Sequence, residues 1–118
     1  MKKLRDSFSY AIRGIAYCIT SQQNLRIHIA AIIAVVALGF WLKVTNGEWY
    51  AILLCCAMVL TAEMINTAIE KLCDVVHPAP HPKIKIIKDV AAGAVLVTAI
   101  AAAICGGIIF FPKLCQLL

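Results

Sequence analysis

The sequence predicts an all-α integral membrane protein with three membrane-spanning helices and an amphipathic helix at its N-terminus. Of its 118 residues, 63% are hydrophobic and 14% are charged, whereas ordinary soluble domains carry roughly 25% charged residues. A soluble domain of this size has too little interior to bury so much apolar surface. Long apolar runs alternate with short polar segments. We interpret the chain as a single domain, residues 1–118.

Residues 3–22 form the predicted amphipathic surface helix. Apolar side chains recur at helical spacing on one face, at Leu4, Phe8, Ile12, Ile15 and Ile19. Such a helix lies in the membrane interface with its apolar face toward lipid; the alternative is a soluble helix packed on a partner. The first apolar run begins only near Ile27, without a small-residue cleavage site after it, so we expect no cleaved signal peptide.

Three spans are expected at about 27–44, 49–76 and 84–111. Thr45–Glu48 is predicted to be a compact turn, because Asn46-Gly47 readily adopts positive φ. The second span has about 28 residues, longer than a roughly 30 Å hydrocarbon core requires, and its polar end should project past the lipid. The alternating prolines of the segment 77–82 exclude regular helix there. We expect the third span to stop at Pro112.

Charge and cysteine content narrow the class of partner. The net charge is +5, but no nucleic-acid-reading motif is visible, which favours anionic lipid headgroups and phosphate-bearing ligands. Basic residues gather before the first span and in the second loop, and the positive-inside rule places both in the cytoplasm. The six cysteines form no CxxC pair and are interpreted as small hydrophobic residues.

The candidate functional residues form a polar stripe on the second span. At about 100° per residue, Glu63, Asn66, Glu70 and Asp74 fall within an arc of roughly 60°. Ionisable residues in a membrane helix are costly and usually functional. Glu70 should lie roughly 10 Å nearer the cytoplasm than Glu63. Glu63 could therefore meet a lipid headgroup, and Glu70 a soluble ligand with its metal, since magnesium commonly takes one or two carboxylates plus phosphates.

Three interpretations of the stripe remain open on this evidence: a phosphotransferase, a non-catalytic membrane subunit whose stripe only specifies assembly, and a proton or cation pathway. Lys88-Asp89 at the start of the third span could supply the cationic clamp of a phosphotransferase. The chain lacks a GxxxxGK[ST] loop and a kinase Gly-rich loop, so a nucleotide site would belong to another class. His28 and the loop histidines match no standard zinc spacing, which favours surface or packing roles.

Three segments carry a family resemblance that covers nearly the whole chain. AEMINTAIEKLCD at 62–74 resembles the signature E-x-x-N-[ST]-A-x-E-x-x-x-D of the small bacterial diacylglycerol kinases, which include undecaprenol kinases. KDVAAGAV at 88–95 is similar to the family's second signature, and NLRIH at 24–28 resembles the pattern before its first span. The resemblance implies a homotrimer in the bacterial inner membrane, with Mg-ATP as phosphoryl donor and a membrane lipid alcohol as acceptor.

The resemblance also implies roles for individual residues. Glu63 would be the catalytic base. The metal would be held by Glu70 and Gln22. The nucleotide would be contacted by Tyr10, Glu70, His81, Lys88 and Asp89. The lipid substrate would be contacted by Arg13, Gly14, Glu63 and Asn66.

The chain departs from the family pattern at two positions. The family usually has glutamate where this chain has Gln22, and again where it has Ala79. A glutamine can still offer magnesium a neutral oxygen, at a weaker affinity. The sequence does not distinguish diacylglycerol from undecaprenol, because both present a hydroxyl above long apolar chains.

Overall fold

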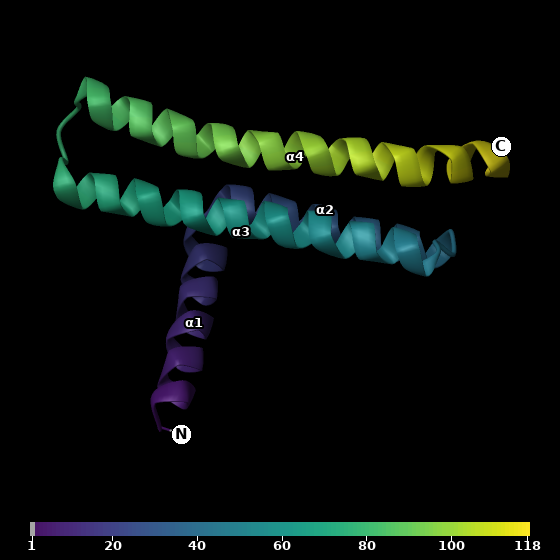
Figure 1. Cartoon of the computed structure of the whole chain (residues 1–118), viewed down its shortest axis with the longest axis horizontal. Helices are drawn as coiled ribbons and strands as arrows, with labels where there is room; N and C mark the ends of the chain where they lie inside the picture. The colour runs from purple at the N-terminus through teal and green to yellow at the C-terminus, as the bar shows by residue number, and fades with distance from the viewer. Residues whose placement is uncertain (1) are drawn as a thin grey trace.

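The fold is a layer of long antiparallel helices with one helix set across it. The computed structural model describes residues 2–118, which form four α-helices and no strand: α1 (Lys2–Ser21), α2 (Gln23–Trp41), α3 (Asn46–Val76) and α4 (Pro82–Leu117). Helices α2, α3 and α4 run side by side, whereas α1 crosses their direction (Figure 1). The all-α prediction is confirmed, and α2, α3 and α4 are each long and apolar enough to cross a membrane.

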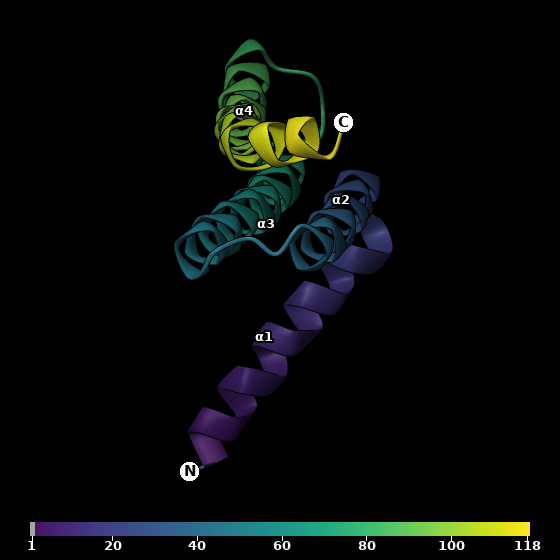
Figure 2. The same ribbon diagram turned by 90° about the vertical axis from the view of Figure 1, so that its right-hand side faces the viewer.

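Helix α3 is the central element of the layer. It packs extensively on α4 and less extensively on α2, while within residues 2–118 no Cα atom of α2 lies within 8 Å of a Cα atom of α4. Figure 2 shows α1 joined to the start of α2 and projecting away from the other helices. The side chains of α3 can therefore meet both neighbouring spans.

Most large apolar side chains of the spans point outward. Leu53 is 65% exposed, Leu54 63% and Ile104 58%. The small buried cluster, Val44, Ile52, Ile109 and Phe110, lies where the first loop meets the end of α4. In water such a surface would be an extensive apolar patch, whereas in a bilayer it faces lipid, so the exposure agrees with the membrane prediction.

The turn between α2 and α3 differs from the prediction. Lys43, with φ 55°, adopts the left-handed conformation, while Asn46 and Gly47 already belong to α3. Thr45 caps this helix: its Oγ1 accepts from the Glu48 N–H at 3.2 Å, and its own N–H donates to Glu48 Oε1 at 2.9 Å. This reciprocal capping box satisfies two N–H groups at the helix start, and it draws the Asn-Gly pair into the first turn.

The helix does not stop at Pro112, where the third span is predicted to end. Helix α4 continues through this proline to Leu117. Proline removes the N–H that would bond to the carbonyl four residues earlier, and Figure 2 shows the last turns of α4 leaving the axis of the rest of the helix. In the extension, Nζ of Lys113 lies 3.1 Å from Glu48 Oε1 at the start of α3.

Gly39 allows the end of α2 to approach α3 closely. A Cβ at this position would lie 2.7 Å from Cη2 of the Trp49 indole, and the same indole packs against Phe40 with ring centroids 4.8 Å apart. The contact therefore requires a residue without a side chain.

We predict that Gly39→Ala destabilises the protein by about 1–3 kcal/mol, because the indole must move out of a packed position. Thermal unfolding in detergent micelles measures the effect. Gly107→Ala is the matched control, since nothing lies within 4 Å of a Cβ placed there. Equal stability of the two variants would contradict the packing argument.

Candidate functional site

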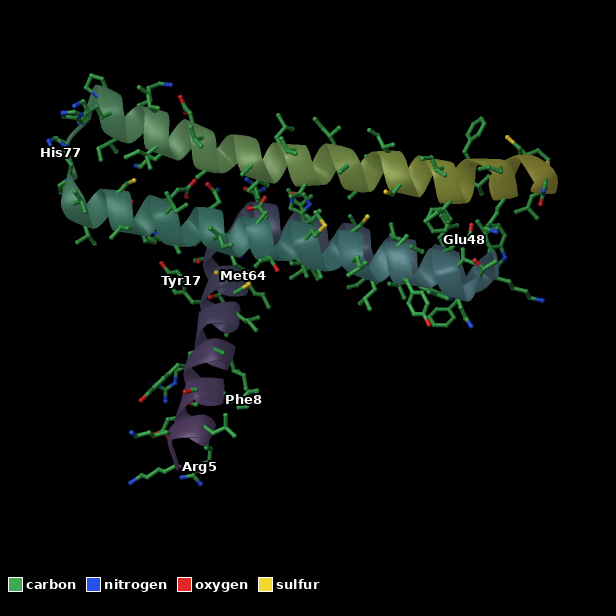
Figure 3. All side chains as sticks on the ribbon, in the orientation of Figure 1. Arg5, Phe8, Tyr17, Glu48, Met64 and His77 are labelled. Atoms are coloured by element: carbon green, nitrogen blue, oxygen red, sulfur yellow. The ribbon has the colours of Figure 1, made fainter. Side chains whose placement is uncertain are left out.

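The polar stripe lies in the half of α3 that leads to the proline loop. Figure 3 shows Glu48 and His77 at opposite ends of the helix, with Met64 between them. Glu63, next to Met64 in the chain, is buried with 5% exposure; Asn66 and Glu70 are partly buried, and Asp74 is exposed. The stripe thus runs from the interior of the helix layer outward to its surface.

Glu63 meets a histidine from the neighbouring span. Oε1 of Glu63 lies 3.1 Å from Nε2 of His28 on α2. The histidine is the better exposed partner, with 26% side-chain exposure against 6% for the glutamate. The Thr67 hydroxyl donates to the backbone carbonyl of Glu63 at 2.9 Å and not to its carboxylate. Sequence analysis had favoured a packing or surface role for His28; its contact with the stripe was missed, because 34 intervening residues separate the two positions in the chain.

Asn66 and Glu70 form the middle of the stripe. Nδ2 of Asn66 donates to Oε1 of Glu70 at 3.3 Å, the i,i+4 pairing expected on one helix face. Oδ1 of Asn66 is buried and has no hydrogen-bond partner within residues 2–118. A buried polar atom without a partner is uncommon and calls for an explanation. Here an amide oxygen and a carboxylate of the same face are placed to receive a further polar group.

The outer end of the stripe is joined to α4. Nζ of Lys88 lies 2.8 Å from Oδ1 of Asp74, so this pair crosses from α4 to α3. Asp89, the next residue, instead pairs with Lys85, with 2.6 Å between Nζ and Oδ2. The predicted clamp residues therefore point to different partners. Lys85 was missed by sequence analysis, although its spacing of four from Asp89 indicates such a pair.

The proline loop and the start of α4 form the walls of an open cavity of 660 Å³. Its lining includes three of the predicted nucleotide contacts, His81, Lys88 and Asp89, together with Ala79. His81 also caps α4, because its Nδ1 accepts from the backbone N–H of Lys83 at 3.1 Å. The cavity is lined by two lysines, Lys85 and Lys88, and one acidic residue, Asp89, and Lys88 links it to the exposed end of the stripe through Asp74.

The predicted contacts on α1 are not brought to the stripe. Tyr10, Arg13 and Gly14 lie on the helix that crosses the layer, and Arg13 packs over the Tyr10 ring at 5.9 Å from its centroid. Gln22 is the extended residue between α1 and α2, and its side chain makes no capping hydrogen bond. The roles of these four residues stay predictions.

An apolar groove of 270 Å³ opens between α2, α3 and α4. Its walls are built from small and apolar residues, among them Ala102, Gly106 and Val59, and His28 is its one lining residue that is neither apolar nor cysteine. The histidine thus contacts both the groove and the Glu63 carboxylate. A buried carboxylate that contacts an apolar groove through His28, and that a polar stripe links to a second cavity, suits a reaction between a hydrophobic and a water-soluble substrate.

Comparison with known proteins decides the family. Residues 9–110 match the family model described as prokaryotic diacylglycerol kinase. The chain belongs to this family. It is 41% identical over 114 residues to an undecaprenol kinase of Bacillus subtilis, covering 97% of this chain and 93% of that protein. It is 39% identical to a diacylglycerol kinase of Synechocystis sp., covering 95% of this chain and 65% of that protein.

A more distant relative is a diacylglycerol kinase of Pseudomonas aeruginosa, 26% identical over 80% of this chain and 76% of that protein. The family predicted from the two signatures is thus confirmed, and with it the assignment to the lipid kinases. The matched range contains the whole stripe, His28 and the proline loop.

The Lys88–Asp74 pair joins two helices but both side chains are solvent-accessible, with 39% and 57% exposure. Exposed ion pairs contribute little to stability. We predict that Lys88→Met and Asp74→Asn leave the unfolding temperature within about 2 °C of the wild type. Differential scanning calorimetry in detergent checks this. A large drop in either variant would mean that the pair acts as a structural clasp between α3 and α4.

Proposed function

We propose that this protein phosphorylates the hydroxyl of a membrane lipid alcohol, diacylglycerol or undecaprenol, with ATP as donor. The observation that carries the proposal is the buried Glu63 carboxylate. It contacts His28, which lines an apolar groove, and the stripe leads from it to Lys88 at the cavity of the proline loop. Membership of the prokaryotic diacylglycerol kinase family supports it independently.

In the proposed mechanism Glu63 accepts the proton of the lipid hydroxyl. The new bond forms between the lipid oxygen and the γ-phosphorus of ATP, while the bond from this phosphorus to the bridging oxygen breaks and ADP leaves. A positioned carboxylate that removes the hydroxyl proton during this step contributes typically 10²–10⁴-fold in rate. Asn66, one turn away, orients the hydroxyl. Arg13 and Gly14 of α1 contact the lipid headgroup region, where an amphipathic helix at the interface would lie. The apolar chains stay in the hydrocarbon layer, so that only the hydroxyl approaches the carboxylate.

The nucleotide is assigned to the loop end of the site. Lys88 provides positive charge for the phosphates, and His81, Asp89 and Tyr10 contact the nucleotide. Phosphoryl transfer depends mainly on positioning and on stabilising charge at the transferred group. The basic lining of the 660 Å³ cavity supports this placement, since Lys88 also contacts the end of the stripe through Asp74.

The residues of the stripe fit a magnesium ion. Asn66 Oδ1 is a buried oxygen without a partner, and the Glu70 carboxylate adjoins the same side chain. No group of three or more His, Cys, Asp or Glu in residues 2–118 could hold a metal. Magnesium usually keeps waters and binds substrate phosphates beside one or two carboxylates. Glu70 would thus supply the charged ligand, and the ion would offset negative charge on the phosphates. Gln22, which the described residues do not bring to the stripe, stays the neutral second ligand that the family resemblance implies.

We further propose a homotrimer in the bacterial inner membrane, with the N-terminus and the proline loop in the cytoplasm and α1 lying in the interface. The basic residues before the first span and in the second loop support this orientation. The apolar face of α1 supports its interfacial position, since Leu4, Phe8 and Ile12 are each more than 60% exposed. The angle between α1 and the spans supports it as well (Figure 1).

The kinase assay tests the proposal directly. Purified protein is incubated with labelled ATP or GTP and with diacylglycerol or undecaprenol in mixed micelles. We predict that Glu63→Gln lowers the rate by on the order of 100-fold or more, because the amide cannot accept the proton. Glu48→Gln is the matched control on the same helix. It should keep wild-type activity because it lies at the far end of α3 (Figure 3).

The same assay separates the alternatives. Undiminished activity in Glu63→Gln would remove the carboxylate from the mechanism. Lack of phosphorylation of either lipid by the wild-type protein, with a loss of assembly in Glu63→Gln, would support the non-catalytic subunit instead. Proton or cation flux into liposomes under a gradient would support the conducting pathway.

Magnesium dependence gives a second test. We predict that Glu70→Gln raises the Mg²⁺ concentration for half-maximal activity roughly tenfold, because a charged oxygen ligand is lost. Gln22→Glu should change it in the opposite direction. Titration of the rate with Mg²⁺ at fixed ATP measures both. An unchanged titration curve in Glu70→Gln would exclude this residue as a ligand.

A further inference from the structure

We infer that His28 is a positioning residue that holds the Glu63 carboxylate in the orientation needed for its reaction, an inference that rests on the proposed function. The histidine touches the carboxylate through Nε2 at 3.1 Å. It comes from α2, whereas the stripe lies entirely on α3. The positioning role therefore belongs to a residue that lies outside the two family signatures at 62–74 and 88–95.

The geometry explains why Glu63 needs such a partner. A carboxylate in a nearly dry site is costly unless it is hydrogen-bonded, and Glu63 is 5% exposed. In residues 2–118 its side chain has one polar contact, the His28 imidazole. Without it, no hydrogen bond within the described residues would fix the orientation of the carboxylate.

The chemistry fixes the direction of the hydrogen bond. An ionised carboxylate can only accept, so His28 Nε2 carries the proton and donates to Oε1. This bond uses one lone pair of one oxygen. The other oxygen of Glu63 is left to accept the proton of an alcohol.

The scaffold makes the contact rigid. Both residues lie within helices, His28 six residues into α2 and Glu63 well inside α3. Groups placed on helices are held more accurately than groups on loops. His28 also lines the apolar groove, where the other lining residues are apolar or cysteine. A hydroxyl at this end of the groove would therefore lie beside the Glu63–His28 pair.

The test replaces the imidazole by groups with and without a donor. His28→Leu removes the donor, whereas His28→Gln keeps an N–H at a similar distance from the backbone. We expect His28→Leu to lower kcat by on the order of 10–100-fold, as misplacement of a reacting group does, with the KM for ATP within about twofold of the wild type. His28→Gln should restore kcat to within about fivefold. Wild-type kcat in His28→Leu would overturn the inference.

Two comparisons exclude a merely structural effect. Leu25→Ala removes a side chain from the same helix that is 3% exposed, so it reports what a packing defect in α2 does to the unfolding temperature and to kcat. In a Glu63→Gln background, His28→Leu should lower kcat no further, because the carboxylate that it positions is gone. A full additional loss in that background would assign His28 to another step and contradict the inference.

A spectroscopic measurement keeps the inference testable if kinase activity is absent. The chain has three histidines, so ¹⁵N-histidine labelling gives few signals, and His28→Gln identifies the one from His28. Glu63→Gln should shift the His28 Nε2 resonance, whereas Glu48→Gln should not. An unchanged resonance in Glu63→Gln would overturn the contact itself. A shifted resonance in a protein without kinase activity would instead contradict the proposed function alone.

Discussion

Glu63 is a carboxylate in the middle of a membrane-spanning helix, and its burial sets requirements for the elements around it. The charge needs a hydrogen-bond donor at a depth where water is scarce. Helix α2 supplies this donor through His28, so α2 must dock on α3 at a fixed height. Helix α4 packs along the other side of α3 and brings Lys88 to the far end of the same stripe. The arrangement of the three spans thus gives both ends of the polar stripe on α3 a partner from a neighbouring helix.

The spans and the stripe could be predicted from the sequence because each depends on local patterns. Long apolar runs mark the helices, and the 3.6-residue period places Glu63, Asn66 and Glu70 on one face. Errors arose where a tertiary contact competed with a local preference. Proline favours a helix end, yet α4 continues past Pro112, where Lys113 reaches Glu48. Asn-Gly favours a turn, yet the Thr45 capping box takes the pair into α3.

The ion-pair partners of the charged groups could not be predicted from the sequence, because they too depend on tertiary contacts. Lys88 and Asp89 are neighbours in the chain, but successive residues on a helix point about 100° apart, so one meets Asp74 and the other Lys85. His28 is tied to Glu63 only by the way α2 packs on α3. The family signatures predict which side chains belong to the site, whereas the packing of the helices determines which of these side chains contact each other.

The unequal lengths of the spans have a consequence for how the protein senses its membrane. Helix α2 has 19 residues and α3 has 31, a difference of roughly 18 Å along the axis. One span therefore matches the hydrocarbon core closely, while its neighbours extend well beyond it. A change in bilayer thickness is accommodated by tilt, and tilting α2 against α3 would alter the height at which His28 meets Glu63. Bilayer thickness would then act on the geometry of the site mechanically, separately from the supply of substrate.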